Sequence, residues 1–450
     1  MPGQQAIVLQ PVPDAPALPG IDFTHSVSTN ELTTRFTKTC KQYLNELRFG
    51  TGNPAATYNT VIDTRLQLIG NTNCIKLSSF YPSVISLDPL HNELLLNGYA
   101  SGRVRLTNLS LWPEDIKVKM HPDQQPIVDF SWFKGEEEHA FVTASADGYV
   151  TVWDSKMLQP FESCKVSDSL AGISMHMGLY AHVAVALPGR HVFMAYPSTD
   201  AKPDFITWKD HNITIVQWHP RDMFYLFCGS TQGKGAIFDL RYPTMPVREV
   251  IPGYGRSENA PTSKVLHPLA KAKFTTDGTK LVWLDKDNMM RVFRMENGTE
   301  ETAFKLECGD HNNQSRFHFD LIEEGFEYRA IVPYDNNISI VSLSANPPNR
   351  YIKHIETGFA GYVTGAKYRK GVQHIVAVST DNQCKVFTPS TDGQPEELQE
   401  DRWIDDEEDR QSEAEDEELL EAPWSSDEED GQSEAEDEEL LEDPWSSDED

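Results

Sequence analysis

The sequence lacks the residue groupings that hold metals or carry out common chemistry. Its six cysteines lie far apart and form no CxxC pair or Cys/His cluster with zinc spacing: Cys40, Cys74, Cys164, Cys228, Cys308 and Cys384. We expect reduced thiols of an intracellular protein. Phosphate loops and nucleophile elbows are also missing. The sequence therefore predicts a non-catalytic protein without metal or cofactor.

Long apolar runs are missing too. No stretch approaches the roughly 20 apolar residues that a membrane span needs. The first twenty residues have neither the basic start nor the apolar run of a secretory signal peptide. We therefore expect no membrane partner and no secretion.

A basic excess is absent as well. The net charge is −31, and residues Glu396 to Asp450 account for most of it, with 29 acidic residues against two basic ones and a local charge of −27. The preceding 395 residues are nearly neutral, with 41 acidic and 37 basic residues. A near-neutral body argues against direct, sequence-specific nucleic-acid binding.

An amphipathic helix is predicted over residues 28–50, after a Pro-rich, flexible stretch over 1–27. Ser28 and Glu31 have capping-box spacing, and Gly50 gives a stop signal. Apolar residues recur at steps of three and four on one face: Leu32, Phe36, Cys40, Tyr43, Leu44 and Leu47. This face either packs on its own domain or is offered to a partner protein.

Short strands and turns repeat from residue 61 to 390. Two copies are clear: IVDFSW, AFVTAS and YVTVWD over 127–154, and ITIVQWHP, FYLFCGS and GAIFDLR over 213–241. Five weaker copies cover 84–107, 171–196, 270–295, 315–344 and 362–389. Each unit has two apolar faces that only neighbours can cover, which predicts an all-β, seven-bladed WD40 β-propeller. We expect RLQLIG (65–70) to supply the outer strand of the last blade.

One repeat also contains a polar set that resembles a catalytic triad: His121, Ser145 (or Thr143), Asp147 and Trp153. The spacing is that of a buried network within a propeller blade, and no nucleophile elbow accompanies it. We therefore assign these residues a structural role.

The tail over 391–450 contains a tandem duplication that starts at Gln411 and again at Gln432. Its high charge and low hydrophobicity predict disorder. Trp424 recurs as Trp445 beside repeated leucine pairs. The tail is thus either a solubilising segment or a carrier of short binding motifs.

Several runs in order resemble one family. They are the helical arm with RLQLIGN, VTASADGYVTVWD, ITIVQWHPRDMFYLF with GAIFDLRYP, AKAKFTTDGTKLVWLDKDNMMRVF, IVPYDNNISIVSL and the ending DPWSSDED. Over roughly residues 29–390 and at the tail, the chain resembles the Cockayne syndrome A family of WD40 DNA excision repair proteins.

The resemblance implies a nuclear, non-catalytic substrate receptor of a cullin-RING E3 ubiquitin ligase. Such receptors dock on the damaged-DNA-binding adaptor and act in transcription-coupled nucleotide excision repair, a branch of the DNA damage response. There they meet the Cockayne syndrome B-type ATPase at stalled RNA polymerase II.

The family's WDxR box implies adaptor contacts at specific residues. Its best match is Phe238 to Arg241, with Phe in place of Trp, so Arg241 would contact the adaptor and Asp239 would orient the turn. Lys156, at the end of the earlier match Trp153 to Lys156, is a further adaptor-binding candidate that keeps the positive charge but lacks the planar fork of arginine. The helix over 28–50 would also contact the adaptor, through Leu32, Phe36, Leu44 and Leu47. The alternative for Arg241 is an exposed residue without a partner. The alternative for the whole chain is a histone- or basic-protein-binding scaffold that uses its acidic tail.

Overall fold

The computed structural model describes residues 29–50, 52–76, 82–90, 92–111, 116–121, 125–133, 140–168, 172–176, 182–187, 191–195, 204–253, 266–307, 319–347 and 349–389. The chain divides into two units, 1–403 and 404–450. The predicted flexible segment 1–27 and the acidic tail over 391–450, with Trp424 and Trp445, lie outside the described residues.

Two helices precede the strands. The first, α1 (Thr29–Phe49), corresponds to the helix predicted over 28–50. The second, α2 (Pro54–Gln67), begins with Pro54, and the Asn53 side chain caps it by accepting a hydrogen bond from the Ala56 amide at 3.2 Å. Pro is favoured at this position because its missing N–H has no helical partner there.

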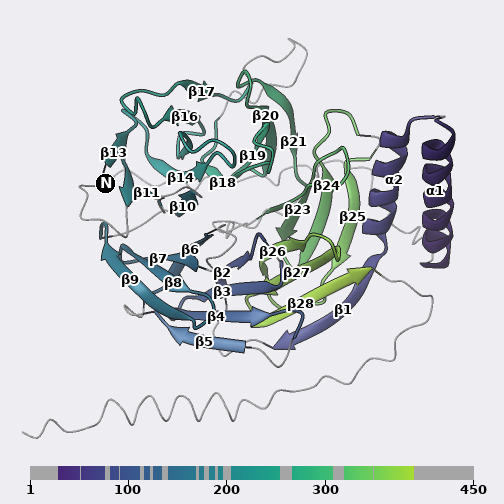
Figure 1. Ribbon diagram of the computed structural model, residues 1–450, viewed down its shortest axis with the longest axis horizontal. Helices are drawn as coiled ribbons and strands as arrows, with labels where there is room; N and C mark the ends of the chain where they lie inside the picture. The colour runs from purple at the N-terminus through teal and green to yellow at the C-terminus, as the bar shows by residue number, and fades with distance from the viewer. Residues whose placement is uncertain are drawn as a thin grey trace, which may run out of the picture. The chain divides into compact units, whose positions relative to one another are not determined.

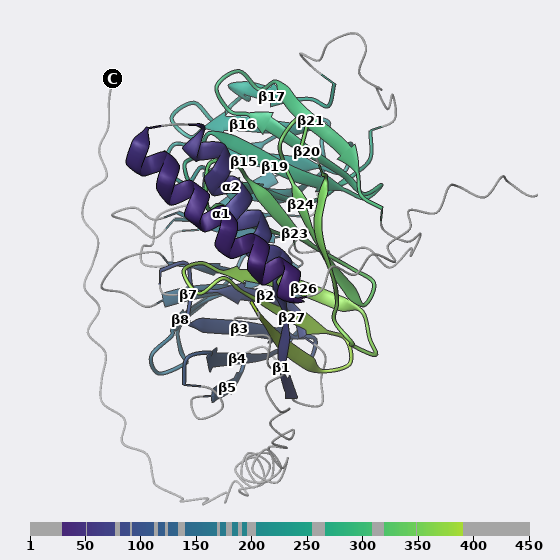
Figure 2. The same ribbon diagram turned by 90° about the vertical axis from the view of Figure 1, so that its right-hand side faces the viewer.

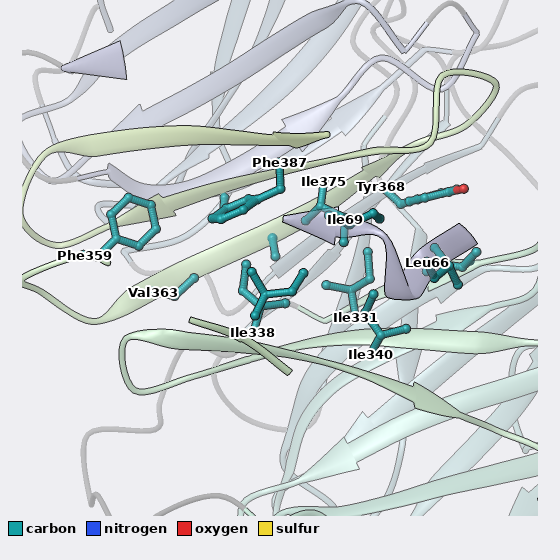
Figure 3. Packing of buried hydrophobic residues seen from close by; sticks show 14 of the residues in the cluster. Leu66, Ile69, Ile331, Ile338, Ile340, Phe359, Val363, Tyr368, Ile375 and Phe387 are labelled. Atoms are coloured by element: carbon teal, nitrogen blue, oxygen red, sulfur yellow. The ribbon is translucent and has the colours of Figure 1, made fainter. Parts of the chain in front are cut away.

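The second helix corrects the prediction for residues 65–70. We expected RLQLIG to be a strand, but the chain stays helical through Gln67, and β1 runs over Ile69–Lys76. The alternation of Leu66 and Leu68 was therefore misleading. Leu66 is buried from the helix, in the cluster that Ile69 shares from the strand (Figure 3).

The described strands form seven four-stranded antiparallel sheets, six of them up-and-down meanders of consecutive strands and the seventh completed by β1. They are β2 (Pro82–Leu87), β3 (Leu94–Tyr99), β4 (Arg103–Asn108) and β5 (Ile116–Met120); β6 (Ile127–Trp132), β7 (Ala140–Ser145), β8 (Tyr149–Asp154) and β9 (Gln159–Lys165); β10 (Gly172–His176), β11 (His182–Ala186), β12 (His191–Ala195) and β13 (Asp204–Thr207); β14 (Ile213–Trp218), β15 (Tyr225–Ser230), β16 (Gly235–Asp239) and β17 (Arg248–Val250); β18 (Leu269–Phe274), β19 (Lys280–Asp285), β20 (Met289–Arg294) and β21 (Glu300–Lys305); β22 (Asp320–Ile322), β23 (Arg329–Tyr334), β24 (Asn337–Ser342) and β25 (Tyr351–Glu356); and β26 (Val363–Arg369), β27 (His374–Ser379) and β28 (Gln383–Pro389) with β1.

The sheets follow one another in a closed ring (Figure 1). The first strand of each sheet contacts the first strand of the next sheet, as β2 does with β6 and β26 does with β2. Between β18 and β22 the link is an ion pair of Lys273 with Asp320. The last sheet is completed by β1, which pairs with β28 from Ile69↔Pro389 to Lys76↔Gln383. A strand from before the ring therefore closes it, as expected, although it starts later than predicted.

The core lies between neighbouring sheets rather than within one of them. Figure 3 shows one such cluster, in which Ile331, Ile338 and Ile340 of one sheet face Ile375 and Phe387 of the next. Burying a side chain of this size stabilises the fold by about 1.5–3 kcal/mol relative to leaving it exposed. The predicted β-propeller with an N-terminal helix is confirmed at this level.

The connections of each meander separate into two rims of the ring. Loops from first to second strand and from third to fourth strand lie at one rim. We call it the helix rim, because Asn59 of α2 accepts a hydrogen bond from the Phe326 amide in the β22–β23 loop, at 2.8 Å. Turns from second to third strand, and the links between sheets, lie at the other rim, here called the turn rim.

Candidate protein-interaction surface

Arg329 fixes α2 to the ring. Its side chain is fully buried at the start of β23 and forms an ion pair with Asp63 of α2. It also donates to the carbonyls of Asn59 (3.1 Å), Glu324 (3.0 Å) and Glu327 (3.0 Å). One side chain thus joins a helix to a strand and its preceding loop, and it holds α2 in one position on the helix rim.

The helix α1 packs along α2 (Figure 2). Tyr43 lies 5.2 Å from Tyr58 between ring centroids, and the Glu46 carboxylate accepts a hydrogen bond from the Thr57 hydroxyl at 2.7 Å. Hydrogen bonds from Gln42 and Thr57 hold the pKa of Glu46 below its ordinary value. This face of α1 is therefore occupied within the chain.

The apolar residues of α1 divide between two faces, which corrects the single predicted face. Leu32 and Phe36 are half-buried. In contrast, Leu44 is 62% exposed and Leu47 is 54% exposed, and Phe49 at the helix end is 65% exposed. One face of α1 therefore packs on α2, while the neighbouring face leaves large apolar side chains in solvent.

Arg241 lies on the same rim, in the loop after β16. Its Nε and Nη2 atoms donate to the two carboxylate oxygens of Asp239 at 2.9 and 2.7 Å. Asp239 also accepts from the Arg241 amide at 3.0 Å, so it orients the turn, and the hydrogen bonds from Arg241 hold its pKa below the ordinary value. The guanidinium carbon lies 4.7 Å from the ring centroid of Phe224. Arg241 is therefore half-exposed but fixed in place.

Exposed apolar side chains also occur in the two loops around Arg241, and the short motif does not predict them. Five large side chains in the two helix-rim loops of this sheet are more than one-third exposed: Met223, Phe224, Tyr242, Met245 and Val247. Together with Arg241 they form what we call the Arg241 patch. The available signal was the apolar composition of 242–247, in a loop where polar residues are typical. Contiguous apolar exposure of this kind marks interaction sites.

Lys156 is not part of the Arg241 patch. It follows β8, two sheets away from β16 around the ring. Asp154 accepts from its amide at 2.7 Å, which repeats the turn at Asp239, but its exposed ammonium group forms no fork with that carboxylate. The two motif matches thus share a backbone turn and differ in side-chain chemistry.

Exposed apolar side chains gather on the helix rim. Among the described loop residues of the ring, the large hydrophobic ones more than one-third exposed there are Leu90, Leu111, Met157, Met223, Phe224, Tyr242, Met245, Val247, Phe326 and Val372. On the turn rim, the described loops contribute Tyr362 alone. In the described loops, the two rims therefore differ in chemistry, and the rim with more exposed apolar side chains also bears the helices.

The polar set of sheet β6–β9 lies together inside the fold. Thr143 Oγ1 sits 3.0 Å from His121 Nε2 and accepts a hydrogen bond from Trp153 Nε1 at 3.0 Å. Ser145 donates to Asp147 at 2.6 Å. Burial lowers the pKa of His121 to about 4. Thr143, rather than Ser145, is therefore the residue that contacts both His121 and Trp153, and the set forms a buried hydrogen-bond network.

Cysteines and metal-binding side chains form no candidate site in the described part of the chain. Cys40, Cys164, Cys228 and Cys384 are not in disulfide bonds, and no group of three or more metal-binding side chains occurs among the described residues. No described helix has the length and apolarity to span a membrane.

The fold can be compared with known proteins. No family model matches the sequence. Among solved structures, the chain is similar to the Cps50 (Swd1) β-propeller domain of Myceliophteria thermophila, with a TM-score of 0.56 and 14% sequence identity over 71% of this chain and 99% of that one. At this level of identity, the likeness speaks to the fold alone. The chain accordingly has a WD40-type β-propeller fold.

Proposed function

We propose that this chain is the substrate-recognition subunit of a cullin-RING E3 ubiquitin ligase in transcription-coupled nucleotide excision repair. The observation that carries the proposal is the gathering of exposed apolar side chains on the rim that bears α1 and α2. A propeller with one apolar rim suits a protein-interaction scaffold, because such surface is costly to leave in water. The motifs shared with the Cockayne syndrome A family supply the specific assignment.

The damaged-DNA-binding adaptor would dock on the helix rim. Leu44 and Leu47 of α1 would enter an apolar groove of the adaptor, while Arg241 and its patch would form a second contact. Aromatic, Met and Arg side chains are typical of the centres of protein interfaces. Because Asp239 already holds Arg241 in place, little side-chain entropy would be lost on binding.

The turn rim would remain free for the Cockayne syndrome B-type ATPase and stalled RNA polymerase II. In this proposal the chain has no catalytic role of its own, and ubiquitin transfer belongs to partner subunits in the nucleus. The chemistry of the two rims supports such a division, since the turn rim is polar in its described loops.

Adaptor binding by the full-length chain tests the proposal. We expect Leu44→Asp with Leu47→Asp, and separately Arg241→Ala, each to weaken binding about 30-fold or more, as hot-spot residues do. Tyr362→Asp, on the turn rim and 52% exposed, is the matched control and should leave the affinity unchanged. Full adaptor affinity in a correctly folded triple variant would refute this docking.

The charge of −27 over Glu396 to Asp450 favours a second candidate, a scaffold that binds histones or other basic proteins. Histone binding that weakens with salt and disappears on truncation after Gln394, without any adaptor binding, would support this candidate over the first.

A further inference from the structure

A row of lysines lines the outer end of the seam between sheets β2–β5 and β6–β9. In β5, Lys117 and Lys119 pair with Leu106 and Val104, so they lie on the side of the sheet that packs against β6–β9. Lys117 Nζ donates to the Lys156 carbonyl at 2.7 Å, which joins the two sheets at this point. We call this region the lysine seam, formed by Lys117 and Lys119 of β5 and by Lys156 in the turn between β8 and β9.

The lysine seam has an unbalanced positive charge. Lys165, at the end of β9, is paired with Asp168 at 3.3 Å. Among the residues that the structure describes, no carboxylate lies within ion-pair distance of Lys117, Lys119 or Lys156. The one acidic residue of β9, Glu162, lies opposite Val152 in the strand register, on the side of the sheet that faces sheet β10–β13. Within the described part of the chain, Lys117 and Lys119 therefore face the seam without a carboxylate partner, and the exposed Lys156 lies in the turn that Lys117 contacts.

At the same place, no described element pairs with the outer backbone edge of β9. This strand is the outermost strand of its sheet, and all its residues are exposed except the half-buried Cys164 (Figure 1). The outer strand β25, in contrast, is covered by α2. A bulge at Phe161 follows Pro160, after which Glu162 to Lys165 continue in regular register. Such an edge can accept an added strand from another chain.

Apolar anchors flank the lysines. Met157 is 64% exposed and Phe161 is 69% exposed. We propose that the lysine seam binds an extended acidic peptide segment of a partner protein, which adds to the edge of β9 from Glu162 to Lys165 while its carboxylates pair with Lys117, Lys119 and Lys156. The apolar anchors and the strand edge favour a peptide over nucleic acid, which would need more cations and stacking platforms. The site does not depend on adaptor docking.

A fluorescein-labelled peptide of alternating glutamate and valine is a suitable probe for the full-length chain. We expect Lys117→Glu with Lys119→Glu and Lys156→Glu to weaken binding at least about tenfold, since three screened ion pairs become repulsive. The matched control is Lys209→Glu with Lys286→Glu and Lys370→Glu, which are exposed lysines elsewhere, and it should bind as the unmodified chain does.

Two further arms test the mode of binding. The same peptide with alternate N-methylated residues cannot form a strand ladder and should lose binding, and amide exchange in 159–165 should slow when the unmethylated peptide is present. Equal weakening by both lysine triplets, or full binding of the methylated peptide, would overturn the proposal. Tighter lysine-dependent binding of a single-stranded oligonucleotide would overturn it in favour of a phosphate surface.

Discussion

Arg329→Met should detach α2 from the ring, with a measurable loss of stability. The guanidinium group is fully buried and makes an ion pair with Asp63 and hydrogen bonds with three backbone carbonyls. Removing one partner of a buried pair costs about 3–5 kcal/mol. The Asp63 side chain is 35% exposed and can be rehydrated, so we expect the lower end, about 3 kcal/mol in the free energy of unfolding.

Urea unfolding measures this loss, and amide exchange locates it. Faster amide exchange in α2, with little change in β14–β17, would show that the contact between α2 and the ring is weakened. Arg294→Met is the matched control, because that side chain is 57% exposed and lies 3.7 Å from Glu301, a contact worth under about 1 kcal/mol. A loss below 1 kcal/mol for Arg329→Met, or equal losses for both variants, would refute the reasoning.

Three buried groups give further predictions. Thr143→Val should cost about 2 kcal/mol or more in urea unfolding, because it leaves two buried ring nitrogens without their hydrogen-bond partner. Burial lowers the pKa of His121 from 6.5 to about 4 in the folded chain. As pH falls from about 6.5 to about 4, the histidine is protonated in the unfolded chain but still neutral in the folded one, so the folded state loses stability. The loss from this histidine between pH 7 and pH 5 should be about 2 kcal/mol and absent in His121→Gln. Lys273 is hydrogen-bonded to Asp320, whereas Lys367 lies 4.0 Å from the same carboxylate and burial lowers its pKa to about 7. Thermal unfolding should therefore show a larger loss of stability for Lys273→Met than for Lys367→Met.

The ring was predictable because its signal is local and repeated. Each unit carries apolar strands of six or so residues with a turn between them, and this pattern recurs along the chain. The last turn of α2 was taken for a strand because the six residues from Arg65 to Gly70 alternate like one, although Arg65 to Gln67 are helical. The residue at which the helix ends and the strand begins is set by the pairing of β1 with β28. This pairing joins distant parts of the sequence, so no local pattern reveals it.

The interaction surface was less predictable than the fold. Arg241 and Asp239 were found because a short motif contains them, and their hydrogen bonds lie within that motif. The exposure of Tyr242 and Met245 depends on which rim their loop reaches, which follows from the closed ring. Similarly, the division of α1 into two faces depends on α2, whose existence was not predicted.

The two apolar areas of the helix rim are separate, which determines how one partner would bind both. The seat of α1 and α2 lies at sheet β22–β25, and the Arg241 patch lies on β14–β17. Between them, sheet β18–β21 presents the loops 275–279 and 295–299, which have no exposed large apolar side chain. A single adaptor must therefore span a polar stretch, and distant contacts of this kind contribute additively to the binding free energy. For one adaptor, the free-energy losses of Leu47→Asp and Arg241→Ala should sum in the double variant within about 0.5 kcal/mol, measured by titration calorimetry. If Arg241→Ala leaves adaptor binding intact while abolishing binding of a different protein, the patch serves a second partner and single-adaptor docking is wrong.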